Sequence, residues 1–290
     1  MATFGLHVVA LIDFLGQASE LAKWDFVPDT PQKMAEWIPA VRRSMGRVTT
    51  WREQSEERAR QFQAERDRFA EQYSKGQPAD LRRLFDEYRK APLYTSHFSD
   101  TLIFCSPLVN EHGYWQVTNV AGMIVTCGTL MLAALATRTV FRGAIEVGML
   151  SRFPTGDPYG PALAKAHHCE AKVAGYPRII VGPDLVSYLD ATVKNPDTGG
   201  PARANRAIAE LCRRCMTQDT DGCWIVDYLN DQFAADAETR ALARDVQHQA
   251  LAFVQAERDR FAKAGDDERA KQLANRYERL LAYFRSRGVT

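Results

Sequence analysis

The sequence has almost no net charge and carries none of the hallmarks of an exported chain. Its 37 Lys and Arg residues are matched by 36 Asp and Glu residues, so the formal net charge is +1. No overall field attracts nucleic acid or an anionic membrane, and we therefore expect no nucleic-acid partner. The first residues lack the basic stretch, apolar stretch and cleavage site of an export signal, which predicts a cytoplasmic location.

Cysteine is scarce as well, with six in 290 residues. Cys212, Cys215 and Cys223 have a loosely zinc-like spacing, but a structural zinc needs four ligands and no second pair follows. His168 and Cys169 lie in a segment with a helical pattern, where consecutive side chains point in different directions. We expect reduced thiols, without disulfides and without a metal at these positions.

Long apolar runs are almost missing too. The longest uncharged stretch, 113–137, could span a bilayer by its length, but Trp115, Gln116 and Asn119 make its first half semi-polar. A single stretch of this kind is more typical of a buried helix than of a membrane span. We therefore expect a core helix and no stable membrane insertion.

Apolar and β-branched runs alternate with helical patterns along the first 190 residues. Residues 6–14 form an apolar run of strand length that ends at an acid, and 94–107 holds two such runs around a turn signal at Ser99 and Asp100. The predicted elements are a strand at 6–14, helices within 17–92, a hairpin at 94–107, a helix at 115–137, a strand at 139–149, a helix at 160–174 and a strand at 176–182.

This order contains the split β-α-β motif, in which the first strand lies beside the hairpin in one antiparallel sheet. We therefore expect an α+β fold with a ferredoxin-like βαββαβ core sheet in residues 1–190, and a long helical insertion at about 17–92. Residues 191–290 are expected to form a mainly helical C-terminal extension, with 223–229 as an edge strand.

The same arrangement predicts that Asp13, at the end of the first strand, lies near Asp100 at the hairpin tip. Two carboxylates at strand ends are the ligands that hard divalent cations prefer, and the phosphates of a substrate supply the rest. Each aspartate taken alone is more typical of a solvated turn or of a helix N-cap than of a metal ligand.

Four segments together resemble the class III nucleotidyl cyclases. They are LIDFLG at 11–16, HFSDTLIF at 97–104, FRGAIEVG at 141–148, and YGPALAKAHHCE followed by YPRIIV at 159–181. The resemblance covers about residues 5–190 and implies a class III cyclase-like fold. It also implies two Mn²⁺ or Mg²⁺ ions per site, a nucleoside triphosphate substrate and a homodimer with composite active sites.

The resemblance assigns roles to particular residues. Metal binding falls to Asp13 and Asp100 and to the backbone carbonyl of Phe14, and the phosphates would meet the amides of the turn that follows, Phe14, Leu15 and Gly16 among them. The remaining positions are Arg142 at the phosphates, Ser96, His97 and Asp157 at the base, and His168 at the position of a transition-state arginine.

Ala164 stands where these cyclases have a ribose-orienting Asn, and Ser96 fits neither an adenylyl nor a guanylyl cyclase. Within the class, the chain most resembles the pyrimidine cyclases of the bacterial Pycsar antiphage systems. The resemblance therefore implies an enzyme that converts UTP to 3′,5′-cyclic UMP as a second messenger of antiphage defence. A CTP cyclase, a catalytically inactive nucleotide-sensing relative and a purely helical interaction protein remain as alternatives.

Overall fold

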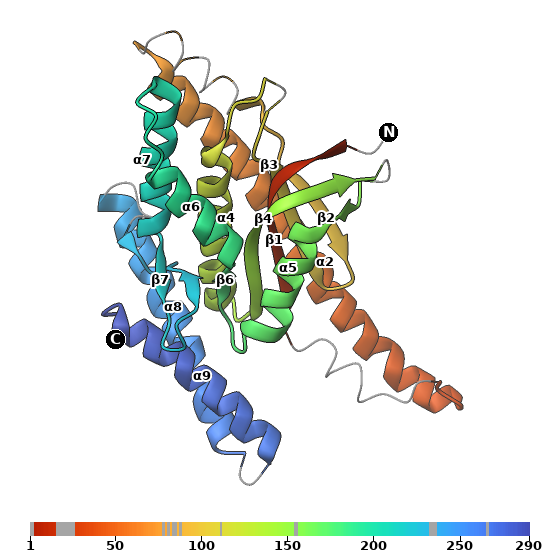
Figure 1. Cartoon of the computed structure of the whole chain (residues 1–290). Helices are drawn as coiled ribbons and strands as arrows, with labels where there is room; N and C mark the ends of the chain where they lie inside the picture. Colours follow the sequence, from red (N-terminus) through yellow and green to blue (C-terminus); the bar gives the residue numbers. More distant parts are fainter. Residues whose placement is uncertain are drawn as a thin grey trace.

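The computed structural model describes residues 3–15, 27–76, 89–110, 112–153, 156–231, 237–264 and 267–290, with isolated positions between 77 and 88. These residues form one mixed eight-stranded sheet with helices on both faces (Figure 1). The predicted α+β class is confirmed.

The sheet has the order β2-β3-β1-β4-β6-β8-β7, and the short β5 pairs with β4. β1 is antiparallel to both β3 and β4, and β4 is parallel to β6. The first strand thus lies beside the hairpin, as the split β-α-β motif predicts. The strands are β1 (Thr3–Phe14), β2 (Tyr94–Phe98), β3 (Thr101–Pro107), β4 (Phe141–Arg152), β5 (Pro158–Tyr159), β6 (Ile179–Val181), β7 (Met216–Gln218) and β8 (Trp224–Val226).

The helical insertion consists mainly of one long helix, α2 (Pro31–Ser74). Thr30 caps its start, because its hydroxyl accepts a hydrogen bond from the amide of Lys33 at 3.2 Å. One end of α2 projects well beyond the sheet in Figure 1. The other helices are α4 (Val117–Ala136), α5 (Pro161–His168), the π-helical turn η1 (Cys169–Val173), α6 (Pro183–Val193), α7 (Gly200–Arg214), α8 (Ala237–Ala262) and α9 (Glu268–Ser286).

Helix α4 lies between the sheet and a second layer that includes α7 and α8 (Figure 1). Neighbours on opposite sides explain why it is apolar almost all round, which is typical of a core helix. It is the one described helix that is long and apolar enough to cross a bilayer, and 67% of its apolar window is buried inside the protein. The prediction of a buried helix at 115–137 is therefore confirmed.

The C-terminal part of the chain contributes to the same sheet. The expected boundary at residue 190 falls inside α6, and β8 pairs with β6 of the core. β8 was expected at 223–229 as an edge strand, but it is an interior strand, and the edge is β7. β7 was not predicted because three residues are too few to show a period of two.

The two faces of β1 meet different neighbours because side chains along a strand alternate. Val8, Ala10 and Ile12 belong to the larger core that includes α4, whereas Val9 and Leu11 pack with Ala162 and Ala166 of α5. Asp13 continues this second face. All six cysteines are free, as expected, and five of them are buried.

Candidate functional site

Asp13 occupies the last but one position of β1, between two strands. It lies opposite Thr101 of β3 and opposite Arg142 of β4 in the antiparallel ladders. Directly opposed residues project to the same face, so the three side chains lie together. The hydroxyl of Thr101 donates a hydrogen bond to Asp13 Oδ1 at 3.0 Å.

Asp100 lies at the tip of the β2–β3 hairpin, next to the end of β1. The turn is tight because Ser99 adopts a φ of 53°, in the left-handed region that glycine normally occupies. The backbone carbonyl of Asp100 accepts a hydrogen bond from the amide of Phe14 at 3.3 Å, and the Asp100 charge acts on Asp13. The structure therefore brings the two predicted carboxylates together.

Glu170 is a third acid of this cluster, and the sequence analysis gave it no role. It lies in η1, is 3% exposed, and forms an ion pair with the Arg142 guanidinium. The continuation of α5 into the π-helical turn carries Glu170 to the end of the sheet where Asp13 lies. Its place at the end of the YGPALAKAHHCE segment was the signal that could have identified it.

The electrostatics around Asp13 are unbalanced toward negative charge. Burial raises the pKa of Asp13 to about 6, and the charges of Glu170 and Asp100 add to this rise, while Thr101 and Arg142 oppose it. A carboxylate with too little positive charge nearby gains from binding a cation.

The donor atoms fit a hard divalent cation better than a soft one. Two carboxylates and a backbone carbonyl at Phe14 are oxygen ligands, which Mg²⁺ and Mn²⁺ prefer, usually together with water and substrate phosphates. Among the residues that the structure describes, no cluster of three His, Cys, Asp or Glu side chains could hold a metal ion. A cation at Asp13 and Asp100 would therefore rely on the Phe14 carbonyl, water and substrate to complete its coordination.

The phosphate contacts expected from the resemblance need correction. The amide of Phe14 donates to the Asp100 carbonyl, and the amide of Leu15 donates to the carbonyl of Val140 at 2.9 Å. Neither N–H group is available to a phosphate in this arrangement, since each has one hydrogen to donate. Gly16 lies outside the described residues.

Arg142 is also engaged, because its guanidinium is paired with Glu170 and its side chain is 21% exposed. In the free protein the buried carboxylate of Glu170 holds this guanidinium, because breaking the pair would leave a buried charge without a partner. Contact with a phosphate therefore requires Arg142 to exchange or share its partner.

Two of the base-site candidates lie together. The hydroxyl of Ser96 donates to the carbonyl of Gly156 at 3.4 Å, which places it beside the loop that carries Asp157. The Arg152 guanidinium donates to the same carbonyl at 3.4 Å and stacks 3.4 Å above the ring of Tyr94. Arg152 was missed by the sequence analysis, and its Nε is buried without a hydrogen-bond partner in the described part of the chain.

His97 does not join this group. It follows Ser96 in β2, so its side chain projects to the opposite face of the sheet, where α2 passes. Its Nε2 lies 3.1 Å from a carboxylate oxygen of Glu56 in α2. The expectation that His97 and Ser96 line one pocket is therefore wrong.

His168 and Ala164 are exposed positions of α5. The buried face of this helix is formed by Ala162 and Ala166. Within the described residues, no hydrogen bond or ion pair connects His168 with Asp13, Asp100 or Arg142. The structure therefore assembles Asp13, Asp100 and Arg142, and it leaves His168 outside their contacts.

Strand geometry also separates the two halves of the expected site. Ser96 and Asp13 share a face, but they are two strands and two residues apart, which corresponds to about 12 Å.

Family models, curated proteins and solved structures were compared with the chain, and none of the three comparisons found a match. The functional argument accordingly rests on the residues and geometry described above.

Proposed function

We propose that this chain is a metal-dependent nucleotidyl cyclase that converts UTP to 3′,5′-cyclic UMP and pyrophosphate. The observation that carries the proposal is the juxtaposition of Asp13 and Asp100 at adjacent strand ends, with the Asp13 pKa raised to about 6. The β-α-ββ-α-β connectivity around them supports a class III cyclase-like fold. In the cell the product would act as a second messenger of antiphage defence in the cytoplasm.

The reaction needs positioning and charge neutralisation more than covalent help from the protein. The ribose 3′-oxygen forms a bond to the α-phosphorus, the bond from that phosphorus to the bridging oxygen breaks, and the 3′-proton passes to solvent. When bound, two divalent cations acidify the 3′-hydroxyl and neutralise the pyrophosphate. Asp13 and Asp100 would hold them, with the Phe14 carbonyl as a further oxygen ligand.

The group around Gly156 supports a small base. Ser96 is too short to reach a purine edge as a lysine or glutamate would, and Asp157 accepts hydrogen bonds when ionised. Uracil offers its ring N–H to such a carboxylate, and cytosine offers its exocyclic amine. We favour UTP over CTP on the resemblance to the cyclic-UMP branch of the Pycsar cyclases.

Exposed aromatic side chains around this group support a homodimer with composite sites. Phe98, Phe153 and Tyr159 are 77%, 47% and 68% exposed. Phe98 shares a face with Ser96, and the other two flank the loop that carries Asp157. Exposed aromatics grouped beside polar residues are typical of an interaction surface. A second copy here would bring the base contacts of one protomer toward the carboxylates of its partner.

A catalytically inactive, nucleotide-sensing relative is the second candidate. Three observations favour it: Ala164 replaces the ribose-orienting Asn, His168 makes no contact with the carboxylates, and Glu170 neutralises Arg142. Such a protein would bind nucleoside triphosphate and metal without releasing pyrophosphate.

Product analysis tests the proposal directly. Purified protein is incubated with each of the four nucleoside triphosphates and Mn²⁺, and products are identified by mass. We expect cyclic UMP from UTP only, and no product after chelation of the metal. Cyclic CMP alone would replace UTP by CTP, cyclic AMP or GMP would contradict a pyrimidine base site, and metal-dependent UTP binding without product would favour the inactive relative.

Mixing two damaged chains tests the composite site. One chain carries Asp13→Asn and the other Asp157→Ala, and each is expected to be inactive alone. Random subunit exchange makes about half of the dimers mixed, each with one intact site, so about a quarter of the wild-type activity should return. Absence of recovery, although exchange is shown by differently tagged chains, would mean that each site is built by one chain.

A further inference from the structure

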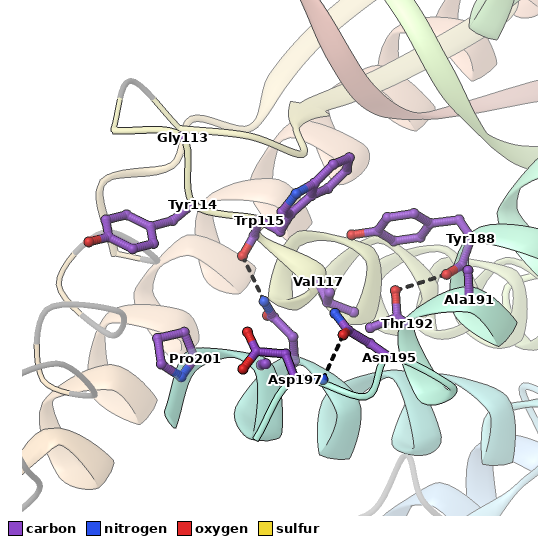
Figure 2. A pocket seen from close by; sticks show the side chains of 12 residues that line it. Gly113, Tyr114, Trp115, Val117, Tyr188, Ala191, Thr192, Asn195, Asp197 and Pro201 are labelled. Atoms are coloured by element: carbon purple, nitrogen blue, oxygen red, sulfur yellow. Dashed lines mark hydrogen bonds between the residues drawn. The ribbon is translucent and has the colours of Figure 1, made fainter. Parts of the chain in front are cut away.

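A pocket lies at the other end of the sheet from Asp13. It has a volume of about 380 Å³ and is formed by residues 113–115, the first residue of α4, helices α6 and α7 and the connection between these two helices (Figure 2). The segment leading to it is fixed beside the start of β1, since the amide of Leu108 donates to the carbonyl of Leu6 at 2.8 Å. Leu6 and Asp13 are separated by about 23 Å of extended strand.

Aromatic rings form part of the pocket wall. The rings of Trp115 and Tyr188 lie with their centroids 5.7 Å apart, tilted by 37°. Trp115 is 45% exposed, so its indole keeps apolar area that a ligand can cover. A large aromatic side chain on a pocket wall is a favourable surface for a planar ring.

Asn205 of α7 supplies a directional polar group. Its amide nitrogen donates to the backbone carbonyl of Trp115 at 3.1 Å, which fixes the side chain and identifies the other atom as the oxygen. That oxygen is buried and has no hydrogen-bond partner among the described residues. A buried acceptor without a donor costs free energy, and a ligand N–H group would satisfy it.

The charge of the lining excludes anions. Asp197 is the one charged residue among the twelve that line the pocket. Its Oδ1 accepts a hydrogen bond from the amide of Gly199 at 2.8 Å, and no Lys or Arg is among the lining residues to balance its negative charge. Arg206 of α7 is not among the lining residues, and its guanidinium donates to the backbone carbonyls of Asn195 and Asp197. A phosphate in the pocket would therefore meet the Asp197 carboxylate before any cation, which favours a neutral ligand over a nucleotide.

We infer that this pocket binds an uncharged nucleoside, with its base against Trp115 and a base N–H group donated to the Asn205 side-chain oxygen. A volume near the lower end of the usual range of about 300–1,000 Å³ suits one base and one sugar. The site is separate from the carboxylates of the proposed cyclase centre and does not depend on that function.

Calorimetric titration of the full chain in the presence of a chelator tests the inference. The probes are uridine, cytidine, adenosine and guanosine, each compared with its 5′-monophosphate. We expect at least one nucleoside to bind, and its monophosphate to bind at least about tenfold more weakly because of Asp197. Absence of binding by all four nucleosides at millimolar concentration would overturn the inference.

Three variants locate the binding site. Trp115→Ala and Asn205→Leu should weaken nucleoside binding by about 5- to 100-fold, since each removes one proposed contact. Ala202→Phe should block binding by filling the pocket, without removing a polar group. Asp13→Asn should leave binding unchanged. If unfolding curves show all three pocket variants to be folded and they bind as the wild type does, the nucleoside lies elsewhere.

Discussion

Replacing Asp13 by asparagine is expected to stabilise the metal-free protein at neutral pH and to abolish the proposed cyclase activity. The folded protein holds the pKa of Asp13 at about 6 through burial and the nearby charge of Glu170, against an ordinary value of 3.8. Asparagine is neutral, keeps an oxygen that can accept from Thr101, and is a poor ligand for a hard cation. The same substitution therefore removes both the repulsion and a ligand of the proposed metal site.

The number of protons bound by the folded and the unfolded chain decides how the free energy of unfolding changes with pH. Between about pH 4 and 6 the folded Asp13 holds a proton that the unfolded chain has lost, so the free energy of unfolding falls as pH rises through this range. A full shift of two units would be worth up to about 3 kcal/mol. Because Asp13 is partly exposed, we expect about 1–2 kcal/mol after solvent screening.

Urea unfolding with a chelator, at pH 4 and at pH 7, measures this effect. The wild type should lose about 1–2 kcal/mol more than Asp13→Asn between the two pH values. Asp231→Asn, at an exposed position, serves as the matched control and should follow the wild type. Mn²⁺ should stabilise the wild type at pH 7 and leave Asp13→Asn unchanged. Equal pH profiles for the wild type and Asp13→Asn would contradict the raised pKa of Asp13 in the folded protein.

Much of the sheet followed from the sequence because its central strands are long. β1, β3 and β4 have enough apolar residues for their length and ends to be recognised, and the split β-α-β order then predicted Asp13 beside Asp100. β6, β7 and β8 have three residues each, so the alternation of buried and exposed side chains cannot predict where they lie in the order of the sheet.

The site residues that the sequence did not predict correctly fall into two groups. Some depend on tertiary contacts, and others depend on the alternation of side chains between the two faces of a strand. Glu170 reaches Arg142 only because η1 follows α5 and packs on the sheet, and no local pattern encodes that contact. His97 is different, because adjacent residues of one strand must face opposite sides. Side-chain alternation along the predicted hairpin strand would therefore have placed His97 and Ser96 on opposite faces of the sheet.

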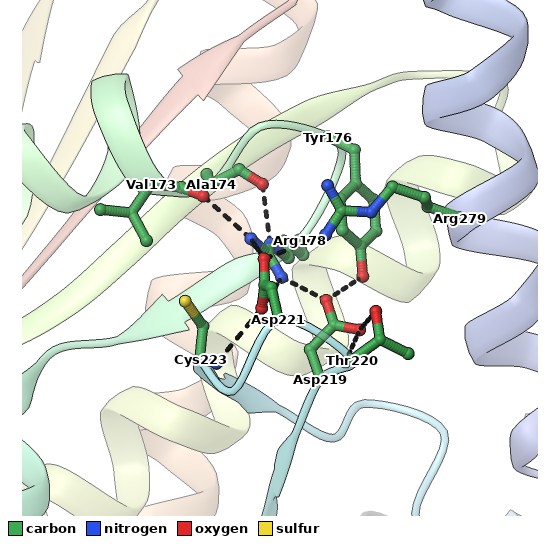
Figure 3. A network of polar contacts seen from close by, with 9 residues as sticks. All are labelled: Val173, Ala174, Tyr176, Arg178, Asp219, Thr220, Asp221, Cys223 and Arg279. Atoms are coloured by element: carbon green, nitrogen blue, oxygen red, sulfur yellow. Dashed lines mark hydrogen bonds and ion pairs between the residues drawn. The ribbon is translucent and has the colours of Figure 1, made fainter.

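Replacing Arg178 is expected to destabilise the protein strongly. Arg178 is 1% exposed at the start of β6, and its guanidinium forms ion pairs with Asp219 and Asp221 of the β7–β8 turn (Figure 3). It also donates to the carbonyls of Ala174 at 2.7 Å and Val173 at 2.9 Å. One buried side chain thus connects three segments of the chain.

Arg178→Met should lower the free energy of unfolding by about 3–5 kcal/mol, since it leaves the nearly buried Asp219 without its cation. Asp221 is less affected because Arg279 of α9 also contacts it, at 2.9 Å. Arg279→Met is the matched control. Its side chain is 44% exposed, so its loss should cost only about 0–1 kcal/mol.

The pH dependence separates the ion pairs from simple packing. Hydrogen bonds from Arg178 hold the pKa of Asp221 below its ordinary value, so this contribution to stability is present above about pH 4 and is lost as pH falls further. The difference between wild type and Arg178→Met should therefore shrink as urea unfolding is repeated from pH 7 down to pH 3. A difference that stays constant with pH would assign the loss to contacts of Arg178 that do not titrate. These are its hydrogen bonds to the carbonyls of Ala174 and Val173 and its cation–π contact with the ring of Tyr176.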